Sequence, residues 1–138
     1  KNFDPHWSLR AGYTHLAIDA VSAKTGENRN GVIPKGVYNF DLQYQQRKFS
    51  GSLTARGIID RPGYKQYEQQ VSDSFKTFWL LDAAVNYRPT KNMQLFFKVN
   101  NIFDRLYTEV PYDMRTPGGD RWYSQPGRFF LTGVQFTF

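Results

Sequence analysis

Arginine and aromatic residues gather in one stretch near the carboxyl end of the chain, between Asp104 and Gln125. The residues of this kind there are Arg105, Tyr107, Tyr112, Arg115, Arg121, Trp122 and Tyr123. The guanidinium group is a rigid fork that binds carboxylate or catecholate oxygens, and Tyr and Trp offer flat surfaces with a polar edge. An earlier stretch, 60–74, adds Tyr64 and Tyr67. These residues predict capture of an anionic metal chelate. In the alternative, Trp122 and Tyr123 only form an interfacial aromatic belt.

Other chemistry finds little support in the sequence. Neither His6 nor His15 has a partner at metal-ligand spacing, and the chain has no cysteine. We find no phosphate-binding loop, nucleophile elbow or zinc motif. Asp104 with Asp113 or Asp120 would be the only carboxylate pair to consider, and solvation of a loop is the simpler role for them. We therefore expect neither an enzyme nor a resident cofactor or metal.

Composition limits the fold to one domain rich in strands. The chain has 138 residues and 17% aromatics, with twelve Phe and nine Tyr, a bias that favours strands. No apolar run reaches the roughly 18 residues that a membrane helix needs. The net charge of +6 comes from dispersed Lys and Arg, so nucleic acid is not an expected partner. Because the chain opens on Lys1 without a signal peptide, we interpret it as a piece of a longer protein.

Apolar and polar residues alternate along much of the chain with a period of two, which is typical of strands. The predicted strands are residues 7–19, 36–45, 48–60, 75–88, 93–103 and 128–138. In the fifth, Leu95, Phe97 and Val99 share one face, opposite Gln94, Lys98 and Asn100. The apolar phase shifts after His15, which predicts a bulge near Thr14 and His15.

The connections between these strands alternate between long and short. The long ones are 20–35, 60–74 and 104–125, and the short ones are 45–47 and 88–92. In an antiparallel meander all long connections then lie at one end, as in outer-membrane barrels, and strands of about 10 residues suit a bilayer crossing. Aromatic residues at the strand ends would form interfacial belts: Trp7, Tyr44, Phe49, Trp79, Tyr87 and Phe138. We predict an all-β, antiparallel transmembrane β-barrel meander. A soluble sandwich or lipocalin-like barrel would alternate as well, with its apolar face inward.

The last strand ends the chain on an aromatic residue. Thr132, Gly133, Phe136 and Phe138 match the spacing of the carboxyl-terminal signal that outer-membrane barrels present to their assembly machinery. We therefore expect these four residues to act as an assembly signal.

Two motifs near the carboxyl end resemble those of the TonB-dependent receptors. The first lies in LFFKVNNIFDRLY, residues 95–107. The family's form is VxNLFDKxY, and the residues that correspond to it here are Val99, Asn101, Ile102, Phe103, Asp104, Arg105 and Tyr107. The second is WYSQPGRFFLTGVQFTF, residues 122–138, in which a Tyr and Pro-Gly-Arg introduce the last strand. The resemblance implies a barrel of about 22 strands with a separate plug domain in its lumen. Residues 1–138 would then be the carboxyl-terminal part of that barrel, about six strands without the plug.

The resemblance also implies a function, partners and a location. It implies an outer-membrane receptor that takes up a ferric siderophore or a similar chelate, with haem or cobalamin as variants, driven by TonB through a missing amino-terminal segment. Expected partners are outer-membrane lipid and lipopolysaccharide, the remaining strands and plug, and the barrel assembly machinery. The alternative is a small outer-membrane barrel of about eight strands with a structural or adhesive role.

Overall fold

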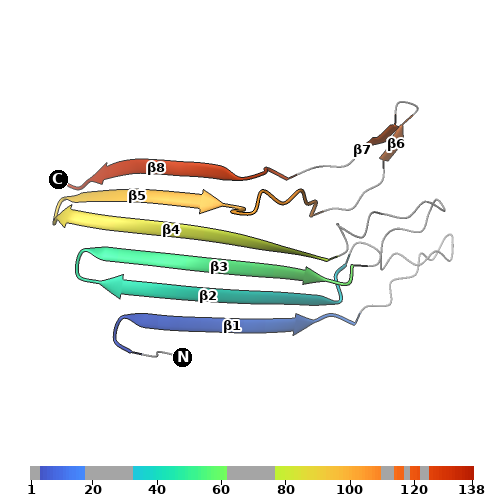
Figure 1. The fold of residues 1–138 in the computed structure, drawn as a ribbon, viewed down its shortest axis with the longest axis horizontal. Coiled ribbons are helices and arrows are strands. Elements are labelled where there is room, and N and C mark those ends of the chain that lie inside the picture. The colour runs from blue at the N-terminus through green and yellow to red at the C-terminus, as the bar shows by residue number, and fades with distance from the viewer. Residues whose placement is uncertain (1–3, 18–32, 62–76, 110–113, 117–118, 122–124) are drawn as a thin grey trace.

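The computed structural model describes residues 4–17, 33–61, 77–109 and 125–138, and the backbone of 114–116 and 119–121. Six strands form one antiparallel sheet in chain order (Figure 1): β1 Trp7–His15, β2 Gly36–Gln46, β3 Phe49–Ile59, β4 Phe78–Thr90, β5 Met93–Asn100 and β8 Phe129–Phe136. This confirms the predicted antiparallel meander. Within these ranges, no helix is long and apolar enough to cross a bilayer.

A second, two-stranded ribbon lies within the stretch 104–125, which we predicted to be only a long connection. It consists of β6, Met114–Thr116, and β7, Gly119–Arg121, which pair in antiparallel fashion.

The predicted bulge near Thr14 and His15 is wrong. Pairing between β1 and β2 runs without a shift from Trp7 opposite Tyr44 to His15 opposite Gly36. The Leu16 amide continues the same register by donating to the Lys35 carbonyl at 2.9 Å. Regular pairing therefore outweighs the change of apolar phase that suggested the bulge.

The irregular pairing lies instead in β4, between Tyr87 and Thr90. We predicted a turn over 88–92, but β4 continues through Pro89 to Thr90, and only Lys91 and Asn92 separate it from β5. Proline has no amide hydrogen to give to a ladder, so a bulge is where a strand accommodates it. β5 in turn ends at Asn100 rather than at 103, because Asn101 takes a φ of 51° and turns the chain away.

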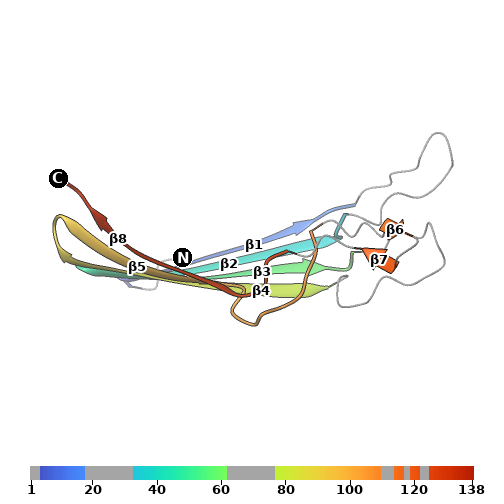
Figure 2. The same ribbon diagram turned by 90° about the horizontal axis from the view of Figure 1, so that it is seen from above.

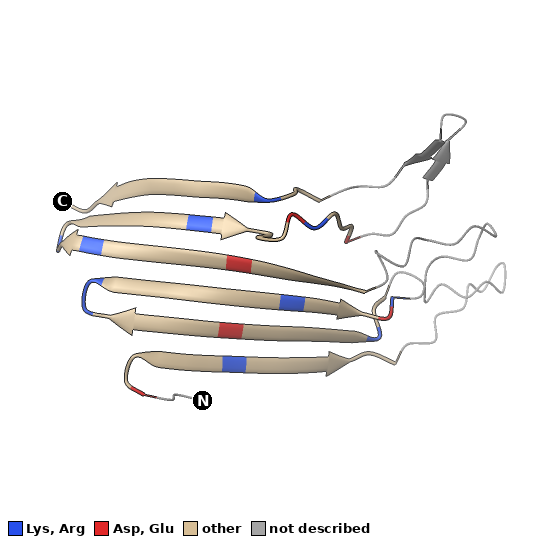
Figure 3. Ribbon diagram, viewed as in Figure 1, with Lys and Arg blue, Asp and Glu red and all other residues tan. Residues whose placement is uncertain are grey.

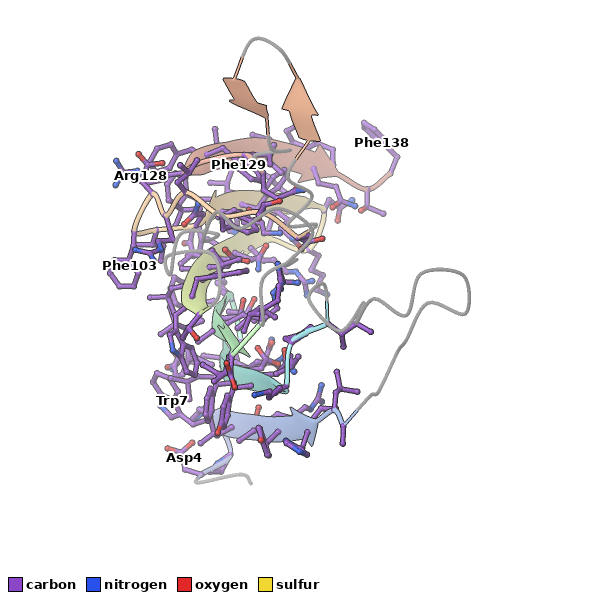
Figure 4. The ribbon with its side chains drawn as sticks, turned by 90° about the vertical axis from the view of Figure 1, so that its right-hand side faces the viewer. Asp4, Trp7, Phe103, Arg128, Phe129 and Phe138 are labelled. Carbon is purple, nitrogen blue, oxygen red and sulfur yellow. The ribbon has the colours of Figure 1, made fainter. Side chains whose placement is uncertain are left out.

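One face of the sheet, here called the outer face, is covered with exposed large apolar side chains. They are Trp7, Tyr13, Phe40, Phe49, Leu53, Trp79, Val85, Tyr87, Phe97, Phe130, Val134 and Phe136. Seen along the strands the sheet is an arc, and Trp7 points from its convex side (Figure 4). Soluble monomers rarely expose so continuous an apolar surface, whereas hydrocarbon accepts it.

The opposite, inner face carries the charged residues of the strands. Near the middle of β1 to β5 these are Arg10, Asp41, Arg56, Asp82 and Lys98, whose sign alternates from strand to strand, and Arg88 lies near the end of β4 (Figure 3). Mid-strand charges are costly in hydrocarbon and ordinary in a wet lumen. The inner face is therefore the lumen side of a barrel wall.

Aromatic residues form a belt at each end of the outer face. Trp7 and Tyr44 have ring centroids 4.7 Å apart at the end with the short turns. Tyr38 lies between Tyr13, at 4.5 Å, and Trp79, at 5.8 Å, at the other end. Six residues of strand separate Trp7 from Tyr13, about 20 Å at roughly 3.3 Å per residue. Outer-membrane barrels likewise carry an aromatic belt on each side of their apolar band.

Glycines in the sheet make room for aromatic rings across the strands. A Cβ atom at Gly57 would lie 2.7 Å from the ring of Trp79, its partner on β4, and one at Gly133 would lie 2.5 Å from the ring of Phe96 on β5. Gly12, by contrast, has open space around its Cβ position. The rings of Trp79 and Phe96 thus cover Gly57 and Gly133 and supply packing that glycine itself cannot.

We expect Gly57→Ala to lower the free energy of unfolding by about 1 to 3 kcal/mol, because the added methyl group overpacks the contact with Trp79. Gly12→Ala is the matched control and should stay within about 1 kcal/mol of the unmodified protein. Urea titration of the intact protein in detergent, followed by tryptophan fluorescence, measures both. Equal midpoints for the two variants would show that Trp79 does not rest on Gly57.

Candidate functional site

The first motif, after β5, forms a tight turn around Asn101. This side chain is only 4% exposed, donates from Nδ2 to the Arg105 carbonyl at 2.8 Å and accepts from the Arg105 amide at 2.9 Å. Its own amide donates to Asp82 Oδ1 at 2.8 Å, which attaches the turn to β4. Asn is well suited here because it tolerates positive φ and imitates a backbone partner.

The second motif contacts the first through Asp104. Asp104 has a φ of 52° and accepts a hydrogen bond from the Arg128 amide at 2.7 Å. Arg128 Nη1 in turn donates to the Ile102 carbonyl at 3.2 Å, and a Cβ atom at Gly127 would lie 2.6 Å from Asp104 Oδ1. The two motifs therefore form one structural clamp that holds the start of β8 beside the end of β5.

After this turn the chain crosses from one side of the sheet to the other (Figure 2). Phe103 projects on the same side as Trp7 (Figure 4). Tyr107 then packs against Phe78 on the inner face, with ring centroids 5.4 Å apart. There it joins the buried residues Ile58, Phe78 and Leu80.

Arg61 attaches the crossing segment to the end of β3. Its Nη1 donates to the Thr108 carbonyl at 2.9 Å, and its guanidinium lies 5.6 Å from the centroid of the Phe78 ring. Burial lowers the pKa of Arg61 and raises the pKa of Tyr107, and Glu109 raises the Tyr107 pKa further. Tyr107 therefore remains neutral at physiological pH.

A cleft of about 360 Å³ opens between the inner face and this segment, toward the end with the long connections. Its lining consists of Asn39, Thr54, Arg56, Leu80, Asp82, Asn100, Asn101, Tyr107, Glu109, Pro126 and Phe129. At its edge Arg56 and Glu109 form an ion pair of 2.7 Å. The Oδ1 atom of Asn100 is buried without a hydrogen-bond partner among the described residues. Mixed charges, amides and aromatic walls are suited to binding.

Nothing in the described part of the chain suggests a metal centre, since it holds no group of three His, Asp or Glu side chains that could ligate one.

The predicted ligand-binding residues are only partly described. Arg105 has an exposed side chain and a backbone held by Asn101, and Tyr107 lies in the wall of the cleft. Arg115 and Arg121 lie on the β6–β7 ribbon, where their backbones pair with Asp120 and Met114. Tyr64, Tyr67, Trp122 and Tyr123 lie outside the described residues, as do the side chains of Arg115 and Arg121.

Sequence reasoning missed Arg56 and Glu109. Arg56 offered a signal, because it is the one charged residue in the strand Phe49–Ile59. Glu109 offered none, because its contact depends on the course of the crossing segment.

The predicted assembly signal lies along the free edge strand β8 and beyond it. Thr132 Oγ1 donates to the Phe96 carbonyl at 3.1 Å, and Gly133 lies under the Phe96 ring. Phe136 is exposed on the outer face, and Phe138 is fully exposed beyond the strand. The Thr137 amide donates to the Asn92 carbonyl at 3.0 Å, which fastens the terminus to the last short turn.

The family described as "TonB dependent receptor-like, beta-barrel" matches residues 2–102 of this chain. The chain belongs to the TonB-dependent receptors. Members of this family are outer-membrane β-barrel proteins of Gram-negative bacteria, and they are transporters rather than enzymes. The match ends at residue 102, within the first motif, so Asp104 and Arg128 of the clamp lie outside the matched residues.

Solved structures of this family share the fold. The copper transporter OprC has a TM-score of 0.72 and 23% identity, over 99% of this chain and 22% of its own. The ferric-catecholate import receptor Fiu from E. coli K12 has a TM-score of 0.64 and 22% identity, over 98% of this chain and 19% of its own. The siderophore receptor PiuA from Acinetobacter baumannii has a TM-score of 0.66 and 18% identity, over 98% of this chain and 20% of its own. The chain thus spans about a fifth of the length of these proteins.

We expect Asn101→Ala to destabilise the receptor by about 1 to 3 kcal/mol, because it removes both hydrogen bonds between the Asn101 side chain and the Arg105 backbone. Glycine adopts a positive φ without strain, so Asn101→Gly removes the side-chain hydrogen bonds and leaves the backbone conformation unchanged. Asn92→Ala, in an exposed turn, is the control. Chemical unfolding in detergent gives the three values. If Asn101→Gly were as stable as the unmodified receptor, the side-chain amide of Asn101 would contribute nothing to the stability of the turn.

Proposed function

We propose that this chain is part of an outer-membrane receptor that takes up a ferric siderophore or a similar metal chelate, driven by TonB. The observation that carries the proposal is the division of the sheet into an apolar outer face and a charged inner face. Such a wall separates lipid from a polar lumen. Arg105 and Tyr107, from the third long connection, follow β5 at the end of the sheet where an entering ligand would arrive.

Two of the similar structures support a chelate as the ligand. Their descriptions name a ferric-catecholate import receptor and a siderophore receptor. An anionic catecholate would suit Arg115 and Arg121, since guanidinium binds paired oxygens through two parallel hydrogen bonds. Haem and cobalamin are the variants of this proposal. Membership of a receptor family favours transport over the structural or adhesive role of a small barrel.

The proposed partners follow from the same wall. The family implies TonB and a plug as partners. We add that outer-membrane lipid and lipopolysaccharide contact the outer face between its aromatic belts, and that the barrel assembly machinery recognises the end of β8. Aromatic rings prefer the level of the membrane interface, which the two belts would occupy.

We expect Arg115→Ala and Arg121→Ala, made singly in the intact receptor, to raise the dissociation constant for the transported chelate by about ten-fold, since each removes a charge-assisted contact. Arg47→Ala is the matched control, because Arg47 lies in a short turn at the opposite end of the sheet. Titration of the purified receptor with the iron complex of a hexadentate tris-catecholate measures binding.

Uptake of the same complex labelled with radioactive iron, in cells with and without TonB, measures transport. Uptake that persists without TonB would refute the proposed mechanism. Unchanged affinity in both arginine variants would place recognition elsewhere in the receptor.

The assembly signal can be tested within β8 and its end. Phe138→Ala should reduce the amount of receptor in the outer membrane several-fold, because the terminal aromatic is the feature that the assembly machinery would recognise. Val134→Ala is the control, since Val134 is exposed on the outer face of β8 but lies outside the signal. Quantitative immunoblots of outer-membrane fractions compare the two. Equal levels would remove Phe138 from the signal.

A further inference from the structure

The ion pair between Arg56 and Glu109 lies at the edge of the inner-face cleft. Arg56 comes from the middle of β3, and Glu109 comes from the segment that crosses to the inner face after β5. Their side chains remain 39% and 52% exposed, so water and solutes reach both charges. The pair is therefore accessible from the lumen rather than part of a buried core.

Arg56 has hydrogen-bonding capacity to spare. Within the described ranges, Glu109 is the one residue for which a bond from its guanidinium is seen, through Nη2 to Oε1. A guanidinium carries five N–H donors, so most of them point to solvent or into the cleft. Asn39 and Asn100 line the same cleft with amide groups, and Asp82 has one carboxylate oxygen occupied by the Asn101 amide.

An exposed pair of this kind is easily exchanged. Ion pairs between solvent-exposed side chains contribute little to stability, because both charges are well solvated when they separate. A ligand that presents two oxygens to one guanidinium gains parallel, charge-assisted hydrogen bonds, whereas Glu109 uses only one oxygen here. A rigid anion with adjacent oxygens would therefore compete effectively with Glu109.

We propose that Arg56 is a ligand-contacting residue of the lumen wall, and that Glu109 occupies it until an anionic ligand with paired oxygens displaces the carboxylate. This inference rests on the proposed function and adds a residue to it. It makes Glu109 a competitor of the ligand, so the two members of one ion pair have opposite effects on binding.

The chain provides a matched control pair. Lys35 and Asp60 are also 2.7 Å apart, with side chains 59% and 58% exposed, and neither lines the cleft. The Lys35–Asp60 pair therefore resembles the Arg56–Glu109 pair in the distance between its charges and in their exposure to solvent. Neutralising them tests whether any exposed ion pair near the long connections alters binding.

The experiment uses the intact receptor in detergent and two iron probes. One is the anionic iron complex of a hexadentate tris-catecholate, and the other is an uncharged ferric trihydroxamate. Arg56→Gln should weaken binding of the anionic probe by about ten-fold, and Glu109→Gln should strengthen it by about two- to five-fold. Lys35→Gln and Asp60→Asn should leave its affinity unchanged. The uncharged probe, if bound, should respond to none of these substitutions.

Misfolding cannot produce the tighter binding expected for Glu109→Gln. The test therefore remains decisive even if Arg56→Gln binds weakly only because it is misfolded. Weaker or equal binding in both variants would mean that the pair is only structural and would overturn the inference. If Arg115→Ala weakened binding while Arg56→Gln did not, the inference alone would fail and the proposed function would stand. If the unmodified receptor bound neither probe, both would fail.

Discussion

The structure depends on the requirement that backbone polar groups be paired wherever a strand has one side in hydrocarbon. Each neighbouring pair of strands in the six-stranded sheet meets this requirement through an antiparallel ladder, with a register shift in β4 near Pro89. Without water, an unpaired backbone group costs several kcal/mol, so a sheet in a membrane must close on itself. In this sheet β1 and β8 each pair with one neighbour, so in hydrocarbon the backbone groups on their outer edges would need further strands to pair with.

That requirement explains where irregularity is allowed. The shift near Pro89 lies next to a short turn, where Lys48 Nζ donates to the Pro89 carbonyl at 3.1 Å and the Arg88 amide donates to the Lys48 carbonyl at 2.7 Å. Positive φ angles occur at Asp60, Asn101 and Asp104, all outside the strands. Side chains compensate there: Asn101 pairs with the backbone of Arg105, and Asp104 pairs with the Arg128 amide.

Alternation made the strands predictable, because a period of two reflects the faces of any half-apolar sheet. The turn predicted over 88–92 was too long, because Arg88 to Asn92 contains a proline and polar residues typical of a turn, yet tertiary pairing carries β4 through to Thr90. Two of the predicted site residues, Arg105 and Tyr107, were correctly assigned to the long connection, but the sequence gives no periodic signal for a segment that crosses the sheet. The contact of Glu109 with Arg56 joins residues far apart in sequence, and only the register and the clamp bring them together.

The clamp between the two motifs has a consequence for how receptors of this kind diversify. The Gln125 amide donates to the Tyr107 carbonyl at 3.0 Å, and the Arg128 amide to Asp104, so both ends of the intervening stretch are joined at its base. Once the ends are joined, the entropy of closing the loop grows only with the logarithm of its length, about 0.6 kcal/mol for each doubling. Insertions and deletions between these anchors are thus nearly neutral for folding. The length and sequence of this connection can therefore change while the sheet beneath it stays in register.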